Sequence, residues 1–514
     1  MAVELPPPLP PQQVAVGEIQ SAKTGEEITV PFQQYTVHVL GNRDLSKDTI
    51  AAAIGAADSL SNAVRALSAS YYAAGYPGVE LHYALSGNDL YVLAVFVKVA
   101  GVKAPEELED YFDGLQGEAL TASNLEPRRV LASTHADFEG ENMVTELTPA
   151  GAPGEYNFAV KHADDVKDPA QIRIEVGNPG NRFVGRNFGQ IELKYGFETG
   201  DQIRALYMDN FAGLNKHNGS DDYSEQQLGW VHATPWGLFG INARYAYYNP
   251  ATSGGPQIDA SIFDGGLSYS GILMADFDNR WTISGRVDRT DKNAQVKVAG
   301  GYDKAQSEVY NSVEIGTDYS WLHESPGSAR WEVEGALTVR KGITSGHAFS
   351  AADPDLGYLL YRPSVRVRMT PAMLSLFTFG VDVLAQYSGD TVPEEQQFVL
   401  GGVNNLYAYL PGVAVGDSGY YGRGQVEFKG LDFTDISVVP KGFFEYGDAK
   451  FNSAGSSIEA KDFTQGSMDA GGEVNVKFGK FLEGAASAAF PFTDHHIDTS
   501  SSAAHYFIKV AVTF

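Results

Sequence analysis

The sequence contains no cysteine among its 514 residues. Disulfide frameworks, thiolate metal sites and cysteine nucleophiles are therefore excluded. Basic residues are also scarce, because 37 Lys and Arg stand against 64 Asp and Glu, for a formal net charge of −27. Phosphate binding needs clustered cations, so nucleic acid is not expected as a partner.

Long apolar runs are missing from the N-terminal part. The longest uncharged apolar run there, 91–97, is far below the ~18 residues that a membrane helix needs. The start of the chain, Met1–Leu5, has no basic n-region and no apolar h-region, so we expect a mature start and no signal peptide. A soluble protein or a transmembrane barrel remains, because only helices and closed barrels satisfy backbone hydrogen bonds inside lipid.

The abundant residues are aromatics and glycine, and 27 Tyr, 28 Phe and 56 Gly indicate many strands and turns. Residues 1–33 are Pro-rich and predict an extended linker without a core of its own. Residues 34–103 read as strand, helix, helix, strand, strand, and residues 104–168 repeat that order more loosely. We therefore predict two small α+β domains after the linker.

From residue 171 onward, helical periodicity gives way to alternation. Ile172, Ile174 and Val176 stand between polar or charged residues, and the pattern recurs in segments of about 10 residues. Soluble strands average about 5–6 residues, and a packed sandwich core does not tolerate the ionised groups that these polar faces carry. We predict that residues 169–514 form an all-β transmembrane antiparallel barrel of about 16 strands around a water-filled lumen.

The last strand ends the chain on an aromatic residue. Its apolar positions alternate with residues such as Lys509 and Thr513. Such a strand is typical of the signal read by the bacterial barrel-assembly machinery, although an ordinary edge strand is the alternative. We therefore expect an outer-membrane location, contact with outer-membrane lipid, and that machinery as a partner. The assembly signal comprises Tyr506, Ile508, Val510, Val512 and Phe514.

Short motifs add a resemblance to a known family. Residues 71–77 (Tyr-Tyr-Ala-Ala-Gly-Tyr-Pro) resemble the end of a POTRA helix, and residues 395–402, 406–412 and 416–421 resemble the stretch that enters a lumen-inserted loop. Residues 443–447 (Phe-Phe-Glu-Tyr-Gly) resemble the Phe-x-Asp-x-Gly motif on the barrel wall. Together they are similar to the two-partner secretion transporters (TpsB, the hemolysin secretion/activation family) of the POTRA-plus-barrel superfamily.

The resemblance implies an outer-membrane translocator, a monomer that recognises an unfolded, β-helical exoprotein through periplasmic POTRA domains and exports it through the barrel. POTRA domains would occupy 34–103 and 104–168, and a loop near 401–419 would enter the lumen. The implied loop tip is Leu406, Tyr407, Ala408, Tyr409, Pro411 and Gly412; the implied anchor is Phe443, Glu445 and Gly447; the implied POTRA docking edges for the exoprotein are Tyr35, Val37, Val39, Val79 and Leu81.

One position departs from the family pattern. The usual Val-Arg-Gly-Tyr tip reads Leu-Tyr-Ala-Tyr here, with Tyr407 in place of the Arg. A tyrosine would donate one neutral hydrogen bond to Glu445, so we expect a weaker anchor unless another cation such as Arg423 substitutes. The departure supports one alternative, a porin or channel that keeps the architecture without secretion. A second alternative, from the resemblance to barrel-assembly relatives, is a membrane-protein insertase.

Motifs for enzymatic chemistry are absent from the sequence, which has no Gly-x-Ser-x-Gly elbow, P-loop or His-Glu-x-x-His site. We expect neither catalysis nor a cofactor. His495 and His496 beside Asp494 lack a third ligand at diagnostic spacing, and the pairs at 221–222 and 353–355 read as solvated turns. We expect no metal site.

Overall fold

A computed structural model describes most of the chain. The described residues are 4–22, 25–152, 154–163, 167–179, 187–210, 222–249, 257–324, 327–349, 353–403, 405–409, 411–452, 466–492 and 505–514. Within these ranges, no helix is both long and apolar enough to cross a membrane, a finding that concerns helices alone.

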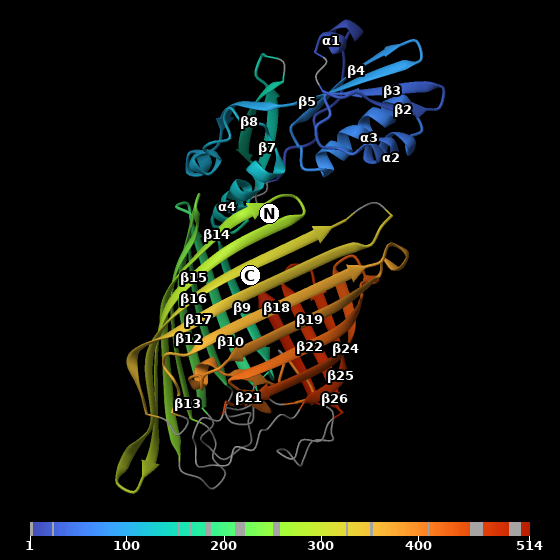
Figure 1. Cartoon of the computed structure of the whole chain (residues 1–514). Coiled ribbons are helices and arrows are strands. Elements are labelled where there is room, and N and C mark those ends of the chain that lie inside the picture. Colours follow the sequence, from blue (N-terminus) through green and yellow to red (C-terminus); the bar gives the residue numbers. More distant parts are fainter. Residues whose placement is uncertain are drawn as a thin grey trace.

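The first domain is a five-stranded sheet with the order β1-β4-β5-β3-β2, covered on one face by two helices (Figure 1). Both helices begin at serines, because the Ser46 and Ser59 hydroxyls accept the N–H groups of Thr49 and Asn62. Their apolar faces close the core. The elements are β1 (Gln12–Gln13), α1 (Val16–Ser21), β2 (Ile28–Phe32), β3 (Tyr35–Leu40), α2 (Lys47–Gly55), α3 (Leu60–Ala73), β4 (Val79–Ser86) and β5 (Asp89–Phe96).

Two expectations for this region need correction. Strand β3 pairs with β2 on one side and with β5 on the other, so its backbone groups are already bonded and Tyr35, Val37 and Val39 form no docking edge. The region 1–33, expected to be structure-poor, contributes β1, α1 and β2 to this domain. Its proline content concealed two strands and a helix that form through contacts with the sheet.

The second domain is a three-stranded sheet with the order β6-β8-β7. Its strands enclose Leu108, Phe112, Leu125 and Phe158 in a second core. Strand β6 precedes residue 104, the expected start of this domain, yet it pairs with β8 and so belongs to this sheet. The elements are β6 (Lys98–Lys103), the 3-10 helix η1 (Glu106–Phe112), α4 (Ala122–Glu139), β7 (Met143–Pro149) and β8 (Glu155–His162).

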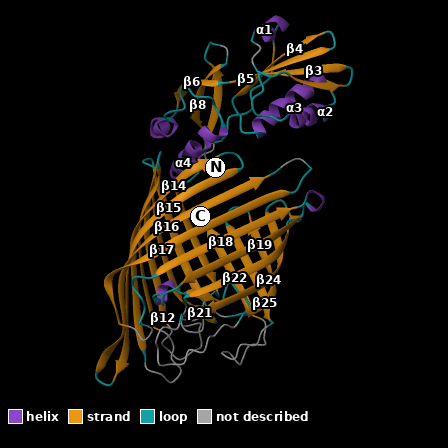
Figure 2. Cartoon of the chain, viewed as in Figure 1, coloured by secondary structure: helices purple, strands orange, loops and turns teal. Residues whose placement is uncertain are grey.

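The remaining chain closes into the predicted antiparallel barrel of 16 strands (Figure 2), counting β22 and its short continuation β23 as one. Closure removes free sheet edges, which a lipid environment requires. In order around the barrel the described strands are β9 (Ala170–Gly177), β10 (Phe188–Phe197), β11 (Asp201–Asn210), β12 (Asp222–Thr234), β13 (Gly237–Asn249), β14 (Ile258–Ala275), β15 (Asn279–Val298), β16 (Gly301–His323), β17 (Arg330–Phe349), β18 (Leu359–Thr370), β19 (Phe377–Ser388), β22 (Ser418–Phe428) with β23 (Leu431–Asp432), β24 (Ile436–Lys450), β25 (Ser467–Phe478), β26 (Leu482–Pro491) and β27 (His505–Thr513).

The first and last strands meet at a short seam. Five register pairs join β27 to β9, from Lys509 opposite Gly177 to Thr513 opposite Arg173. The terminal residue extends the seam, because Phe514 and Ile172 exchange both backbone hydrogen bonds, at 2.8 and 3.1 Å. The C-terminal residue is therefore part of the closure of the barrel.

The outer face of the barrel is apolar. Ile172, Ile174 and Val176 point outward and are exposed, as the alternation predicted, and the same holds for Ile191 and Ile241 on other strands. An exposed apolar surface that encircles a closed barrel suits lipid and not water. The barrel therefore presents a surface suited to a membrane.

Candidate functional site

A long segment between β19 and β22 lies inside the barrel, and its described part comprises residues 389–403, 405–409 and 411–417, here called the lumen loop. Its base is fixed by Asp417, whose carboxylate is fully buried and accepts the N–H groups of Val392 at 2.8 Å and Asn452 at 2.7 Å. Within the loop, β20 (Phe398–Leu400) pairs with β21 (Ala414–Gly416). The segment is thus a folded hairpin.

The tip of the lumen loop contacts the wall formed by β24 and β25. The carboxylate of Glu445, which has no exposed surface, accepts the backbone N–H of Tyr407 at 2.8 Å and the hydroxyl of Tyr421 at 2.5 Å. Asp469 accepts the backbone N–H of Ala408 at 2.7 Å. Two buried carboxylates therefore hold the tip through its backbone.

The predicted anchor differs in detail from this arrangement. The Tyr407 hydroxyl donates to Glu473 at 3.1 Å and not to Glu445, because the main chain at 407 already occupies that carboxylate. The guanidinium of Arg423 lies 3.4 Å from Glu445 and stacks 5.0 Å from the Tyr407 ring and 4.3 Å from the Phe443 ring. A cation from the neighbouring strand thus stands beside the anchor carboxylate.

The other predicted residues of the tip and anchor lie in the same cluster. Leu406, Ala408 and Tyr409 are buried with Phe443. Gly447 gives room to the loop, since a Cβ there would come within 3.1 Å of the Leu400 side chain. Pro411 packs against Gly402, and the Gly412 N–H donates to the Leu400 carbonyl at 2.9 Å.

A second anchor, which the sequence did not suggest, holds the first half of the loop. The ammonium group of Lys292 on β15, with 1% of its side chain exposed, contacts Glu394 at 2.5 Å and Glu395 at 3.4 Å. Arg340 donates to the Gln396 side chain at 2.9 Å. In the sequence, Lys292 is simply a lysine on the polar face of an alternating strand. Because Glu394 and Glu395 lie about a hundred residues further along the chain, nothing in the sequence pairs them with Lys292.

The two anchors stand on walls nearly half-way round the barrel from each other, because β15 and β25 are well separated in the strand order. Beside the loop the lumen keeps a cavity of about 710 Å³. Its lining carries ionised groups of both signs, as predicted for a water-filled lumen. They are Lys194, Arg204, Arg244, Asp264, Arg286, Asp288, Arg340, Arg362 and Glu395.

The second domain sits directly on one end of the barrel (Figure 1). The Tyr111 hydroxyl donates to His135 Nδ1 at 3.0 Å, which leaves Nε2–H to donate to Glu139 at 2.7 Å and to the Glu198 carbonyl of the β10–β11 turn at 3.3 Å. Gly196 on β10 permits this approach, because a Cβ there would lie 1.6 Å from the Phe138 carbonyl oxygen. The helix α4 therefore rests on the barrel rim.

The first domain also contacts the barrel. The ring of Tyr72 on α3 stacks on Phe277 of the β14–β15 turn, with 5.4 Å between centroids. Burial, and then the nearby Glu126 carboxylate, raise the pKa of Tyr72, so its hydroxyl stays a hydrogen-bond donor.

Comparison with solved structures identifies this architecture. The chain superposes on CdiB from Escherichia coli with a TM-score of 0.69 at 14% identity, over 96% of this chain and 91% of that one. CdiB from Acinetobacter baumannii gives 0.64 at 12% identity, over the same shares of the two chains. BamA from Haemophilus ducreyi lacking POTRA domains 1–3 gives 0.53 at 10% identity, over 95% of this chain and 100% of that one. The chain has the POTRA-plus-barrel fold.

Sequence comparison points to the same class. No family model matches this POTRA-plus-barrel protein. The heme/hemopexin transporter protein HuxB of Haemophilus influenzae is 24% identical over 342 residues, which is 64% of this chain and 57% of the relative. The chain thus spans little more than half the length of the curated relatives it matches. The predicted resemblance to two-partner secretion transporters is confirmed.

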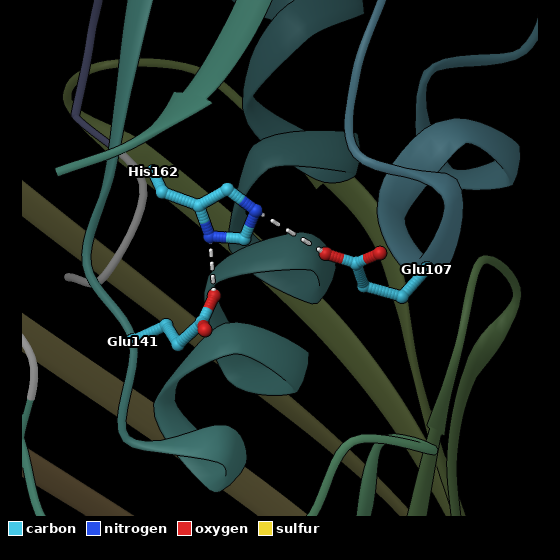
Figure 3. A group of neighbouring side chains, drawn as sticks. All are labelled: Glu107, Glu141 and His162. Atoms are coloured by element: carbon cyan, nitrogen blue, oxygen red, sulfur yellow. Dashed lines mark hydrogen bonds and ion pairs between the residues drawn. The ribbon is translucent and has the colours of Figure 1, made fainter.

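The second domain carries a cluster of two carboxylates and a histidine, apart from the lumen loop (Figure 3). Within the described ranges, Glu107, Glu141 and His162 are the one group of three that could offer ligands to a metal ion. Each ring nitrogen of His162 faces a different carboxylate, Nδ1 at 2.6 Å from Glu141 and Nε2 at 3.7 Å from Glu107. The imidazole ring thus contacts one carboxylate through each of its two nitrogens. A metal ion would need both carboxylates on the side of the one nitrogen that binds it.

The remaining predicted residues can also be placed. Tyr506, Ile508 and Val510 on β27 are exposed, as is Phe514 just after it, and Val512 is half-buried. Val79 and Leu81 lie on β4 with their side chains in the first core. His495 and His496 lie outside the described residues.

Proposed function

We propose that this chain is an outer-membrane translocator that recognises an unfolded partner exoprotein through its periplasmic POTRA domains and exports it through the barrel. The observation that carries the proposal is the lumen loop, which crosses a charged lumen and is held at two anchors by hydrogen bonds and ion pairs, beside an apolar cluster at its tip. The hydrogen bonds and ion pairs can be exchanged for water. The loop can therefore close the lumen at rest and move aside for a polypeptide.

An unfolded exoprotein is a suitable partner for the sheet edges of the POTRA domains. An unfolded chain offers backbone N–H and C=O groups, and a sheet edge accepts them by strand addition without strict sequence readout. Folding of a β-helical exoprotein outside the cell makes passage directional without a nucleotide. The barrel would act as a monomer, assembled by the barrel-assembly machinery, and it would carry out no covalent reaction.

As part of this proposal we assign roles to individual residues of the loop and of the wall that it contacts. Leu406, Tyr407, Ala408, Tyr409, Pro411 and Gly412 form the gate, and Phe443, Glu445 and Gly447 form the wall on which it closes. Arg423 supplies the cation next to Glu445.

Secretion in a reconstituted host tests the proposal. Candidate β-helical exoproteins are expressed in a bacterium with and without this chain, and export is measured in the medium. Export should require both proteins and should fall when the first POTRA domain is deleted. Ion conductance of the purified barrel with no export of any candidate would favour a porin and contradict the proposal.

The seam separates translocation from membrane-protein insertion. Val176 and Val510 face each other across β9 and β27, and cysteines at both positions can be bridged in this cysteine-free chain. Bridging should leave export unchanged, because the path runs through the lumen. An insertase that opens between these strands would lose its activity.

A further inference from the structure

The N-terminal residues 4–21, here called the lead, run along both POTRA domains. At one end, the N–H of Glu4 donates to the Met143 carbonyl of β7 at 2.9 Å, and the Glu4 carbonyl accepts the Thr145 hydroxyl at 2.8 Å. Strand β7 is an outer strand of the second sheet. The lead therefore contacts that edge through one backbone hydrogen bond and one side-chain hydrogen bond.

The middle of the lead lies at the junction of the two domains. The Pro6 carbonyl accepts the Tyr72 hydroxyl at 3.0 Å, and Leu9 is buried against Val97 and Tyr156. Prolines keep this stretch extended and remove its N–H donors, so it reaches from one sheet to the other while offering few hydrogen bonds of its own.

The far end of the lead covers the first sheet. Residues Gln12 and Gln13 pair in parallel with His82 and Tyr83 of β4, and the Val14 N–H donates to the Tyr83 carbonyl at 3.0 Å. Ile19 of α1 is fully buried on the sheet face opposite α2 and α3. The pairing involves two residues of β4, which spans Val79–Ser86, so most of this edge lies beyond β1.

We propose that the lead is a resident ligand of the β4 and β7 edges, and that an extended, proline-free segment of the exported polypeptide displaces it. This inference rests on the proposed function and assigns the docking surface within it. The occupant is an extended polypeptide, because the lead already makes backbone hydrogen bonds at both edges, as a paired strand on β4 and as a single bond on β7. A segment without proline can pair with more residues of β4 than β1 does. Each additional backbone N–H then donates a hydrogen bond to the edge of β4 and strengthens binding.

The lead is suited to displacement because its own structure is weak. Helix α1 has six residues and depends on the buried Ile19 for its position. Covalent attachment gives the lead a high effective concentration at the edges, so a competing segment must bind them more tightly than the lead does. The lead would thus keep weak binders off the edges until a suitable polypeptide arrives.

Peptide exchange on the full chain in lipid nanodiscs tests the inference. The first probe is a fluorescent peptide with the sequence of residues 4–22, and the second carries Thr in place of its five prolines. The second probe should bind the wild-type chain more tightly than the first. The variant Leu9→Ala/Ile19→Ala should bind both probes at least tenfold more tightly, whereas Glu18→Ala, at an exposed position of α1, should match the wild type.

A reversible bridge supplies the second measurement. Cysteines at Gln12 and His82, joined by a short thiol reagent that a reductant cleaves, fix the lead on β4 and should prevent binding of both probes until reduction. The matched control joins Thr148 to Asn157, which face each other on β7 and β8 and leave the lead free. Equal binding to the bridged and reduced Gln12/His82 proteins would overturn the inference, as would no gain in the double variant. Neither assay uses export, so failure of the proposed function would appear separately.

Discussion

At the scale of single residues, Glu445 is one of two buried carboxylates that hold the tip of the lumen loop. Glu445 has no exposed surface, and the main-chain N–H of Tyr407 adds to the contacts that Tyr421 and Arg423 make with it from the barrel wall. Opening the loop must therefore replace the bond from Tyr407. We expect that loss to favour the closed arrangement in the absence of a polypeptide.

Substitution of Glu445 should release the tip. Glu445→Ala removes the acceptor for Tyr407 and leaves the buried Arg423 with only the more distant Glu473 carboxylate, 3.8 Å away. Breaking a buried ion pair costs about 3–5 kcal/mol at comparable sites. We expect larger and more frequent open states in single-channel recordings and a lower melting temperature. Glu445→Gln keeps one acceptor oxygen, so its open-state frequency and its melting temperature should lie between those of the wild type and Glu445→Ala. The control Glu334→Ala removes a largely exposed lumen carboxylate and should change conductance little.

The resemblance of short motifs to a known family predicted part of this site. The stretch 406–412 and the motif 443–447 were assigned to a loop and its wall from the sequence, and the structure brings them into contact. The sequence did not reveal that the main chain at 407 would take the place of the missing Arg side chain. Backbone donors carry no residue-specific pattern, so such a contact is invisible without coordinates.

At the scale of elements, alternation in residues 171–514 was sufficient to predict strands, their outward faces and their approximate number. The period of two is dictated by the pleat, and lipid on one side with water on the other makes it unusually clear. The strand partners in the first sheet were harder to predict from the sequence. Strands β3 and β5 pair in parallel although two helices separate them along the chain. Tyr35, Val37 and Val39 were therefore assigned to an edge when they lie in the interior of the sheet.

Both anchors hold the same element, the lumen loop, so we expect the loss of either anchor to make opening of the loop more frequent. Lys292→Met removes the cation that holds Glu394 and Glu395, and we expect more frequent opening than in the wild type. The control Lys297→Met lies on the same strand, where its ammonium group contacts only Gln257 among the contacts described. A double-mutant cycle with Glu445→Ala then measures the coupling of the anchors. Strict additivity would show that the two halves of the loop move independently.

At the scale of the whole molecule, the POTRA domains and the barrel form a stack whose joint is a close backbone approach. Gly196→Val should push α4 away from the β10–β11 turn, because a side chain there overlaps the Phe138 carbonyl. We expect faster proteolysis between residues 163 and 170 and wider distances between spin labels on α4 and the barrel. Gly229→Ala, on β12 with ordinary space around it, should change neither measurement. Unchanged spin-label distances in Gly196→Val would show that the joint is held elsewhere.

The placement of both anchors has a mechanical consequence. The loop is held at two parts of the wall that lie nearly half-way round the barrel from each other, so we expect a change in the cross-section of the barrel to strain one of the two anchors. Lateral pressure from the surrounding bilayer should then influence how often the loop leaves the lumen. A thinner or more compressed membrane should shift the balance between shut and open barrels even when no cargo is present.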